Sequence, residues 1–461
     1  MKLQGIKTLV LGAGKSGIGA AKFLAERGAT VALHDRKPIE DWTDEARSLK
    51  TERVGLLNGQ FPSWLLDQID LVVISPGVPA GTIPARYVER KDGEVIGEVE
   101  LAYRFMKGRI VGITGSNGKT TTTTLIGELL KNAGIKTQVG GNIGTPLIDL
   151  AESSTEKTWT VCELSSFQLE TIKDFRPNVA VGLNVTPNHL DRYNFFSDYA
   201  AAKHRLFMNQ TPDDAAILNA DDEITLNWAE NLKATVVLFS TVKELDEGLF
   251  LRGRDLICRA SGKEKILTTR DEMTLRGVHN VQNVLAGLAA GLACGAAPDS
   301  MRETLRGFQA VEHRLEFVAE IKGVKFYNDS KATSVDASVK ALEALSEEAG
   351  KTVLILGGRG KNATYQPLAD LVKETVRRLV LIGEDADNIE SQLKAFAEIV
   401  RAENMKDAVV KSFENAESGD AVLLAPACAS FDMFKNFEER GTVFKTEVLN
   451  LNSKARAGQA K

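Results

Sequence analysis

Short runs of valine, isoleucine and leucine recur along the chain, and each one ends at a glycine, asparagine, aspartate or proline. Longer stretches lie between them, in which apolar residues repeat with the period of a helix. Strands that are apolar on both faces and alternate with helices are typical of parallel sheets covered by helices. The pattern therefore predicts an α/β protein with mostly parallel sheets.

The expected elements form three consecutive blocks. In the first block we expect strands at residues 8–11, 30–34 and 71–75 and a helix at 17–27. In the second block we expect strands at 109–113, 158–163, 179–184 and 215–219 and helices at 119–133, 199–209 and 279–294. Residues 235–275 alternate less regularly and are expected to be antiparallel. In the third block we expect strands at 324–327, 353–356, 379–382 and 421–424, followed by a polar tail at 452–461 that is expected to fray.

The length of the chain agrees with these blocks. At roughly 150 residues per domain, 461 residues correspond to three domains, which we expect at residues 1–97, 98–310 and 311–461. A strand that leads into a glycine-rich loop and a helix occurs at Gly12 and again at Gly115. Because such units bind phosphates in many nucleotide-binding proteins, two separate nucleotide-type folds are predicted.

Composition narrows the class of protein. The chain is 43% hydrophobic and 26% charged with a net charge of −5 and no long basic block, so a globular protein without a large nucleic-acid footprint is expected. The four cysteines lie far apart, which disfavours a disulfide framework or a zinc site and fits a reducing compartment. No apolar run reaches the roughly 20 residues of a membrane span. We therefore expect a cytoplasmic protein without a membrane partner.

The segment from Ile113 to Thr121, with the sequence ITGSNGKTT, is the most informative in the chain. It follows a predicted strand and opens a predicted helix, the setting that a phosphate-binding loop requires. Glycines allow backbone N–H groups to close around phosphate oxygens, and the helix N-terminus adds favourable partial charge. Lys119 would reach the β- and γ-phosphates, and the Thr120 hydroxyl would help to hold Mg²⁺. Ile113 stands where the strict motif has its first glycine, and a glycine turn without a ligand is the alternative.

The first glycine loop, from Gly12 to Gly17, matches the dinucleotide-binding fingerprint, and Asp35 ends the next predicted strand where a ribose-binding acid belongs. Taken alone, this pattern suggests a nicotinamide enzyme. The same turn also holds other diphosphates, so binding of a nucleotide diphosphate is favoured over a redox cofactor or a purely structural turn. Lys15 could add a positive charge to such a site, or it could be solvated.

Three further residues are candidates for metal binding. Glu163 ends a predicted strand beside the phosphate loop and could coordinate Mg²⁺, although a solvated strand-end glutamate is the alternative. His189 lies in a loop after the next strand and could ligate a second metal, but a lone histidine is more often an ordinary loop residue. Lys203 lies on the predicted helix 199–209, where a surface lysine would be unremarkable.

Two clusters of polar residues point to ligand binding in the later blocks. Asn280 and Asn283 stand three residues apart at the start of a predicted helix, so both face the same side and suit an adenine or phosphate edge. Capping would explain one of them but not both. The run NDSKAT at residues 328–333 follows a strand of the third block. This cluster of charged and hydroxyl groups fits a ligand site better than a simple turn.

Taken in order, these segments resemble the Mur ligase family from one end of the chain to the other. The motifs that carry the resemblance are GAGKSG at 12–17, SPG at 75–77, TGSNGKTT at 114–121, GGNIG at 140–144, ELSSFQLE at 163–170, NVTPNHLDRY at 184–193, HN..N at 279–283, HR at 313–314, NDSKAT at 328–333 and PACASFDMFKNFEERG at 426–441. TGSNGKTT marks the wider superfamily, which includes folylpolyglutamate synthases. NDSKAT and the 426–441 segment narrow the resemblance to the members that add D-glutamate.

The resemblance implies a three-domain α/β fold with a Rossmann-like N-terminal domain, a central P-loop ATPase domain with a mostly parallel sheet and a Rossmann-like C-terminal domain. It implies an ATP-dependent ligase that adds D-glutamate to UDP-N-acetylmuramoyl-L-alanine through an acyl phosphate, in peptidoglycan precursor synthesis, acting as a monomer. The first domain would then hold the UDP-substrate rather than NAD. The residues implied in that binding are Gly14, Lys15, Ser16, Asp35, Arg36, Ser75, Gly77, Asn142 and His189.

The other implied roles concern ATP, metal and the amino acid. ATP would contact Gly115, Ser116, Asn117, Gly118, Lys119, Thr120, Thr121, Asn280, Asn283, Arg314 and Asp329. Two Mg²⁺ ions would be held by Thr120, Glu163, His189 and Lys203. Lys203 would be carbamylated, which turns it into an anionic ligand. The catalytic residues would be Lys119, Glu163, His189 and Lys203. D-glutamate would be held by Lys331, Thr333, Lys361, Ser430 and Phe437.

Three other readings remain open from the sequence. A folylpolyglutamate-type ligase shares the ATP loop but should lack a diphosphate-binding first domain. A nicotinamide oxidoreductase built on the 12–17 loop would leave the 114–121 loop unexplained. A non-catalytic nucleotide-binding regulator would hydrolyse ATP without dependence on an amino acid.

Overall fold

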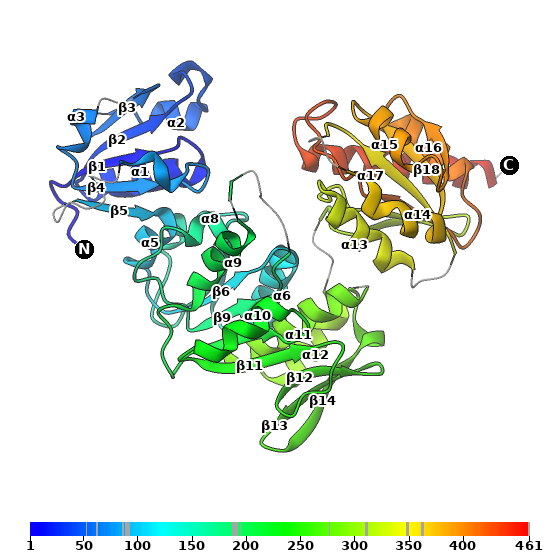
Figure 1. The fold of residues 1–461 in the computed structure, drawn as a ribbon, viewed down its shortest axis with the longest axis horizontal. Helices are drawn as coiled ribbons and strands as arrows, with labels where there is room; N and C mark the ends of the chain where they lie inside the picture. Colours follow the sequence, from blue (N-terminus) through cyan, green and yellow to red (C-terminus); the bar gives the residue numbers. More distant parts are fainter. Residues whose placement is uncertain are drawn as a thin grey trace. The chain divides into compact units, whose positions relative to one another are not determined.

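The computed structural model describes residues 1–51, 53–60, 63–84, 87, 93–186, 192–193, 195–275, 277–308, 312–346, 350–360 and 364–459. Its internal contacts divide the chain into two compact units. The first unit contains residues 1–272 and 282–306, and the second contains residues 273–281 and 307–461. Figure 1 shows three sheets in chain order, each flanked by helices.

The first sheet has the strand order β3-β2-β1-β4-β5 and is parallel throughout. Its strands are β1 (Lys7–Leu11), β2 (Thr30–Asp35), β3 (Val54–Asn58), β4 (Leu71–Ile74) and β5 (Glu94–Gly97). Its helices are α1 (Lys15–Glu26), α2 (Asp44–Ser48), α3 (Ser63–Leu66) and α5 (Glu98–Tyr103), with single 3₁₀ turns at Ile39–Asp41 and Ala80–Thr82. The chain reverses its direction of winding between β1 and β4, and ligands of such sheets bind at this point.

The second sheet has the order β14-β13-β12-β11-β10-β9-β6-β8-β7. Its strands are β6 (Arg109–Thr114), β7 (Thr137–Gly141), β8 (Trp159–Glu163), β9 (Val179–Gly182), β10 (Ala215–Asn219), β11 (Thr235–Ser240), β12 (Gly248–Arg252), β13 (Asp255–Ala260) and β14 (Lys263–Thr269). Its helices are α6 (Lys119–Asn132), α7 (Leu147–Leu150), α8 (Ser166–Leu169), α9 (Phe196–His204), α10 (Glu223–Trp228), α11 (Val278–Ala293) and α12 (Pro298–Gly307), with 3₁₀ turns at Arg205–Phe207, Ala229–Asn231 and Arg270–Glu272. β6 lies between β8 and β9, so the carboxyl ends of these strands meet at one edge.

The third sheet has the order β15-β16-β20-β17-β18-β19. Its strands are β15 (Glu316–Ile321), β16 (Val324–Asn328), β17 (Thr352–Gly357), β18 (Val376–Ile382), β19 (Glu398–Arg401) and β20 (Ala421–Leu424). Its helices are α13 (Val335–Ser346), α14 (Ala369–Thr375), α15 (Ala386–Leu393), α16 (Met405–Glu414) and α17 (Phe437–Gln459), with a 3₁₀ turn at Gln366–Leu368. β16, β20 and β17 are parallel neighbours, so the loops that follow them lie together.

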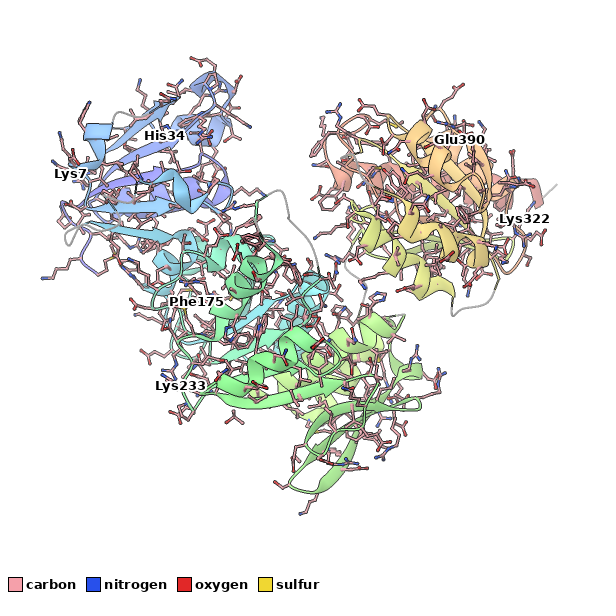
Figure 2. The ribbon with its side chains drawn as sticks, viewed as in Figure 1. Lys7, His34, Phe175, Lys233, Lys322 and Glu390 are labelled. Atoms are coloured by element: carbon pink, nitrogen blue, oxygen red, sulfur yellow. The ribbon has the colours of Figure 1, made fainter. Side chains whose placement is uncertain are left out.

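The cores are made by the apolar strands and by the helix faces that cover them, as the hydrophobic pattern predicted. β4 and β17 are buried along their whole length, which explains why their sequences are unbroken apolar runs rather than alternating ones. Figure 2 labels Phe175, which is fully buried, and Lys233 and Lys322, which are exposed. The α/β class and the mostly parallel sheets are confirmed, and the exact domain limits at residues 97 and 310 remain a prediction.

The structure differs from the sequence-based expectations in two segments. Only part of residues 235–275 is antiparallel, because β11 pairs with β12 in parallel and the antiparallel pairs are β12–β13 and β13–β14. The tail after residue 452 was expected to fray, but α17 continues to Gln459. Alanine, lysine, arginine and glutamine there have good helix propensity, which a polar composition hides. Among the described residues, no helix is both long and apolar enough to cross a bilayer.

Candidate active site

The loop between β6 and α6 is shaped by two glycines. Gly115 and Gly118 have φ values of 158° and 82°, which side-chain-bearing residues rarely adopt. A Cβ atom on Gly118 would also lie 2.2 Å from Asn283 Oδ1. The backbone N–H groups of Ser116 and Asn117 donate to Asn184, to its carbonyl oxygen at 2.8 Å and its Oδ1 at 2.9 Å. The two glycines and the bonds to Asn184 therefore fix the shape of this loop.

Two lysines converge on this loop. Lys119 Nζ donates to the carbonyl oxygens of Gly115 and Ser116, at 2.8 and 3.0 Å, and Lys203 Nζ donates to Gly115 O at 2.8 Å. Lys203 is 1% exposed. Burial lowers the pKa of Lys203 well below its usual value, the charge of Lys119 lowers it further, and Glu163 acts in the opposite direction. A buried amine in this setting favours the neutral form, which is the reactive form of a lysine.

Glu163 ends β8 at the same edge of the sheet and is 2% exposed. Its Oε1 accepts a hydrogen bond of 2.9 Å from the Asn142 side-chain amide. Its Oε2 is buried and has no hydrogen-bond partner among the described residues. A buried carboxylate oxygen without a partner is unfavourable unless a ligand meets it, and Mg²⁺ prefers such oxygens. The donor set therefore fits a magnesium ion.

A pocket of about 600 Å³ lies in the first unit, between the first sheet and the loop that follows β7. The glycine loop after β1, the end of β2 and the SPG segment after β4 form its N-terminal walls. Its lining includes eight of the nine residues predicted to hold the UDP-substrate: Gly14, Lys15, Ser16, Asp35, Arg36, Ser75, Gly77 and Asn142. Their common position is a finding, and their role in binding stays a prediction.

Asp35 supports the pocket through its backbone contacts. Its carboxylate accepts hydrogen bonds from the N–H groups of Ala13 and Lys37, at 2.9 and 3.0 Å. Burial raises the pKa of this carboxyl, but the two N–H donors outweigh burial and hold the pKa below its usual value. Asp35 is thus ionised at neutral pH and fixes the glycine loop against the end of β2. His34, labelled in Figure 2, is 5% exposed and bonds Gly59 O through Nε2 at 2.7 Å.

The residues predicted to contact ATP are divided between the two units. The loop from Gly115 to Thr121 and Asn283 belong to the first unit, and Asn280, Arg314 and Asp329 belong to the second. Asn283 Oδ1 accepts from the Thr122 hydroxyl at 3.3 Å. Burial raises the pKa of Asp329 to about 6, against the opposing charge of Arg314. The residues predicted to contact ATP therefore form two groups, one in each unit.

The residues predicted to hold the amino acid gather at the carboxyl edge of the third sheet. Lys331 and Thr333 follow β16, Ser430 follows β20, and Phe437 begins α17. The two loops are joined by a 2.9 Å hydrogen bond from Ala427 N to Ala332 O, and Lys331 Nζ lies 5.6 Å from the centre of the Phe437 ring. Four of the five predicted residues are therefore close together, and their binding role stays a prediction.

The buried Arg440 side chain bonds to both the loop after β16 and the loop after β20. It is 1% exposed, and its guanidinium donates to Ser330 Oγ, Ser330 O and Cys428 O at 2.9, 2.8 and 3.1 Å. All three acceptors are uncharged oxygens. Burial lowers the pKa of Arg440 to about 10, so the group stays charged at neutral pH and adds positive potential to a site expected to take a dicarboxylate.

Two predicted site residues, His189 and Lys361, lie outside the described residues. Within the part of the chain that is described, no cluster of three or more histidine, cysteine, aspartate or glutamate side chains could hold a metal ion. Of the four predicted metal ligands, Thr120, Glu163 and Lys203 are described, and only Glu163 is of these types.

The chain thus combines a phosphate-type loop, a glycine-lined pocket beside the first sheet and a cluster of polar residues at the edge of the third sheet. Three family models match the chain in this order: the Mur ligase MurD-like N-terminal domain at residues 6–97, the Mur ligase middle domain at 113–291 and the Mur ligase glutamate ligase domain at 313–428. The chain belongs to the Mur ligase family.

Individual Mur ligases show the same likeness over nearly the whole length. The chain is 46% identical over 448 residues to a UDP-N-acetylmuramoylalanine–D-glutamate ligase from Koribacter versatilis, covering 97% of this chain and 98% of the relative. It is 46% identical over 454 residues to the protein of the same name from Solibacter usitatus, covering 98% and 100%. Among solved structures, the UDP-N-acetylmuramate–alanine ligase MurC of Thermotoga maritima matches with a TM-score of 0.59 at 19% identity over 96% of this chain and 99% of that one. That likeness shows the three-domain α/β Mur ligase fold.

Three residues that line the pocket or fix the loops of the third sheet were not singled out from the sequence. His34 and Gln168 line the 600 Å³ pocket, and Arg440 fixes the loops of the third sheet. Gln168 gave no separate signal because its side chain also completes the N-terminal cap of α8 with Ser165. Arg440 stands in the 426–441 motif, but an arginine near a helix start looks like a surface residue until its burial is known.

Proposed function

We propose that this protein is an ATP-dependent ligase that joins D-glutamate to UDP-N-acetylmuramoyl-L-alanine and releases ADP and phosphate. The relatives that share 46% of its residues over nearly their full length bear the name of this activity. The single structural observation that carries the proposal is the hydrogen bond between Asn142 and Glu163. It joins the wall of the pocket to the carboxylate beside the phosphate loop, so a UDP-linked substrate and a nucleotide can meet there.

The chemistry requires activation of a carboxylate. A carboxylate is a poor electrophile because attack on it would have to expel oxide. Transfer of the γ-phosphoryl group of ATP to the substrate carboxylate forms a C(O)–O–P bond, breaks the γ-phosphorus bond to the bridging oxygen and releases ADP. The amine of D-glutamate then attacks the acyl carbon, loses a proton and expels phosphate. Phosphorylation thus replaces oxide by phosphate as the group that leaves the acyl carbon.

The chain supplies positive charge where these anions must approach each other. Lys119 now bonds to the carbonyl oxygens of its own loop, and a triphosphate in the loop offers it a charged acceptor, which is the stronger partner. The N-terminus of α6 adds partial positive charge to the same place. Preorganised donors of this kind stabilise the charge that develops during phosphoryl transfer.

Magnesium fits the same edge of the sheet. Glu163 and Thr120 would hold one ion, and His189 together with Lys203 would hold a second. The partnerless Oε2 of Glu163 supports the first of these assignments. When bound, Mg²⁺ supplies positive charge that neutralises phosphate oxygens.

Lys203 would act as a carbamate. Its neutral amine attacks carbon dioxide, forms an N–C bond and loses a proton, which leaves a carboxylate at the end of the side chain. The lowered pKa of Lys203 supports this step because only the neutral amine carries the required electron pair. The modification would replace a buried amine by an anion that can bind metal.

D-glutamate would bind in the second unit. Lys331 and Lys361 are suited to its two carboxylates, and the Ser430 hydroxyl, Thr333 and the Phe437 ring would complete the site. The buried charge of Arg440 supports binding of a dianion at the same edge. We infer that the protein acts in the cytoplasm, where ATP and UDP-linked precursors are found, as a monomer and without nucleic-acid or membrane partners.

The deciding experiment is phosphate release by the full chain with ATP, magnesium and UDP-N-acetylmuramoyl-L-alanine against a panel of D- and L-amino acids. We expect release with D-glutamate and very little with any other member of the panel or without an acceptor. Release that does not depend on an amino acid would instead support a nucleotide-hydrolysing regulator. Folate-dependent use of L-glutamate would support a folylpolyglutamate-type ligase, and a fluorescence titration with NAD(P) tests the oxidoreductase reading.

A further inference from the structure

Two glutamates on α5 are buried although neither has been given a role. Glu98 and Glu100 are 2% and 0% exposed. They lie two residues apart on the short helix that follows the last strand of the first sheet. Burial of a carboxyl group is unfavourable unless hydrogen bonds offset it. Their partners therefore show what each residue holds in place.

Glu98 bonds to the start of α7. Its Oε1 accepts from the N–H of Ile148 at 2.7 Å, and its Oε2 is buried without a hydrogen-bond partner among the described residues. The first N–H groups of a helix have no partner within that helix. The residue at the N-cap, Pro146, has no side-chain group that can accept them. The Glu98 side chain, which comes from another segment of the chain, therefore takes the place of an N-cap side chain.

The loop before α7 forms one wall of the 600 Å³ pocket through Gly141, Asn142, Gly144 and Pro146. One end of this loop is fixed where Asn142 bonds to Glu163, through its side chain at 2.9 Å and its backbone N–H at 2.8 Å. The other end is fixed where Ile148 bonds to Glu98. The wall is thus held between two buried carboxylates.

The same helix also contacts the helix that carries the glycine loop. α7 packs against α1 as well as α5, and a Cβ atom on Gly19 of α1 would lie 2.6 Å from Asp149 Oδ1 and 3.0 Å from Ile148 Cγ2. The opposite wall of the pocket, from Gly14 to Ser16, begins that α1 helix. The position of α7 therefore sets the spacing between the two walls.

We propose that Glu98 is a positioning residue that holds the Gly141–Pro146 wall at the distance from the glycine loop which a UDP-linked sugar requires. The inference rests on the proposed function, because that function supplies the occupant of the pocket. The diphosphate and uridine meet the wall built from the first sheet, whereas the sugar meets the wall that Glu98 fixes. Loss of Glu98 should therefore weaken binding of the whole substrate more than binding of UDP.

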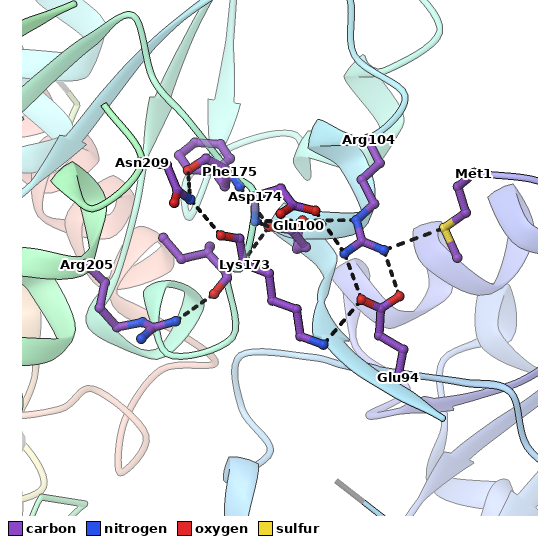
Figure 3. A network of polar contacts seen from close by, with 10 residues as sticks. Met1, Glu94, Glu100, Arg104, Lys173, Asp174, Phe175, Arg205 and Asn209 are labelled. Carbon is purple, nitrogen blue, oxygen red and sulfur yellow. Dashed lines mark hydrogen bonds and ion pairs between the residues drawn. The ribbon is translucent and has the colours of Figure 1, made fainter. Parts of the chain in front are cut away.

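Glu100 provides a matched control. It lies on the same turn of the same helix but accepts from Arg104 at 3.0 Å and from the backbone N–H groups of Lys173, Asp174 and Phe175, at 2.8 to 3.1 Å (Figure 3). Glu94 and Lys173 extend this network at the surface. None of these partners lines the pocket. Replacement of Glu100 should therefore disturb the fold without altering the preference for substrate over UDP.

The test measures binding of UDP and of UDP-N-acetylmuramoyl-L-alanine to the full chain by calorimetry, at a temperature where each variant is folded. Because loss of Glu98 leaves a buried N–H of α7 without an acceptor, Glu98→Ala should weaken binding of the whole substrate about 10- to 100-fold. UDP affinity should stay within about twofold. Glu98→Gln keeps an acceptor oxygen and should restore the substrate affinity to within about threefold.

Glu98→Asp guards against a failure of the alanine variant to fold. Its carboxyl group is drawn back by one carbon–carbon bond, about 1.5 Å, so this variant should show the same selective loss while keeping a carboxyl group. Glu100→Asp should lower the melting temperature without such a loss. Equal weakening of UDP and substrate in the Glu98 variants, or the same selective loss in Glu100→Asp, overturns the inference.

Failure of the proposed function is separable from failure of this inference. Hydrogen exchange needs no substrate, and the Ile148 amide should exchange faster in Glu98→Asp than in the parent chain, with no such change in Glu100→Asp. If the parent chain does not bind UDP-N-acetylmuramoyl-L-alanine but the Ile148 amide responds, the proposed function is wrong and the anchoring role of Glu98 stands. An unchanged Ile148 amide overturns the anchoring role itself.

Discussion

The Asn142 side-chain amide donates a hydrogen bond of 2.9 Å to Glu163 Oε1, and the Asn142 backbone N–H donates to Glu163 O at 2.8 Å. The two residues come from the ends of neighbouring parallel strands, β7 and β8. Asn142 lines the substrate pocket, and Glu163 turns its other oxygen, which has no described partner, away from that bond. One side chain thus connects the pocket wall with the expected magnesium ligand.

Replacement of Asn142 by alanine should impair turnover through Glu163 as well as through the pocket. Glu163 Oε1 would lose its donor, and the carboxylate would no longer be held in one orientation. We expect kcat to fall about 10- to 100-fold, because neighbours that orient a metal ligand contribute about that factor. The magnesium concentration for half-maximal rate should rise. Steady-state phosphate release at varied magnesium measures both.

Gln138→Ala is the matched control for this variant. Gln138 lies on β7, the strand that Asn142 directly follows, but its side chain bonds to Leu150 O and Thr160 Oγ1 rather than to Glu163. Its magnesium dependence should match that of the parent chain. An unchanged magnesium dependence in Asn142→Ala would show that the Asn142–Glu163 bond does not tune the metal site.

The fold could be predicted from the sequence because its signals are local. Apolar runs in β4 and β17 and the glycines at 115 and 118 each specify their own conformation. β7 and β15 lacked such signals. β7 contains two glycines and is only partly buried, and β15 is an antiparallel edge strand with a register shift. Tertiary pairing, rather than local preference, makes these segments strands.

Some residues of the candidate site could be predicted from local sequence, and others could not. The phosphate loop follows from residue types and spacing, and the lining of the pocket follows from motifs at the ends of strands. Glu98 and Arg440 could not be predicted, because their roles depend on burial and on partners 50 and 110 residues away in the chain. Nothing in the sequence near Lys203 indicates that it is buried beside Lys119. Only packing makes that lysine chemically distinct.

Replacement of Lys203 by alanine should nearly abolish turnover, and short carboxylic acids should partly restore it. The lost carbamate leaves a space in which a small carboxylate can supply the missing anion. Phosphate release by Lys203→Ala, measured with and without added formate or acetate, tests this. Restoration by the acids but not by chloride at equal ionic strength is the expected pattern.

The control for this rescue is the neighbouring cation. Lys119→Ala loses a group that must be positive, so carboxylic acids should not restore its activity. If the acids fail with Lys203→Ala as well, Lys203 does not act as a carbamate. Parallel assays of the two variants under one set of conditions decide between these outcomes.

Replacement of Lys331 by alanine should mainly weaken the use of D-glutamate. Lys331 lies at the carboxyl edge of the third sheet, where it is expected to meet one carboxylate of the amino acid. Loss of one charged hydrogen bond corresponds to roughly a 10- to 100-fold rise in KM for D-glutamate. KM for ATP should change little. Lys325→Ala, an exposed change on β16 itself, should leave both KM values near those of the parent chain. An unaltered KM for D-glutamate in Lys331→Ala removes this lysine from the acceptor site.

Glu98 should also make stability depend on pH. Burial raises the pKa of Glu98 from 4.5 to about 7, the N–H groups of Ile148 and Leu147 oppose this, and Asp149 adds to it. The folded chain therefore keeps a proton that the unfolded chain releases above about pH 4.5. The contribution to the free energy of unfolding is fully present below that pH and is lost as the pH rises through about 7. The loss amounts to about 3 kcal/mol.

Glu98→Gln isolates this contribution, because glutamine fills the same space and does not titrate. Chemical unfolding of both chains from about pH 5 to about pH 8 should show the parent losing about 2.5 kcal/mol relative to the variant. Asp329, whose pKa burial raises to about 6, titrates in the same interval but is present in both chains, so the difference between them cancels its effect. Cys162 lies near Glu98, and burial raises the pKa of its thiol, so it stays neutral throughout. Parallel stability curves for the two chains would therefore mean that Glu98 is already ionised at pH 5, and that its bonds to α7 outweigh its burial.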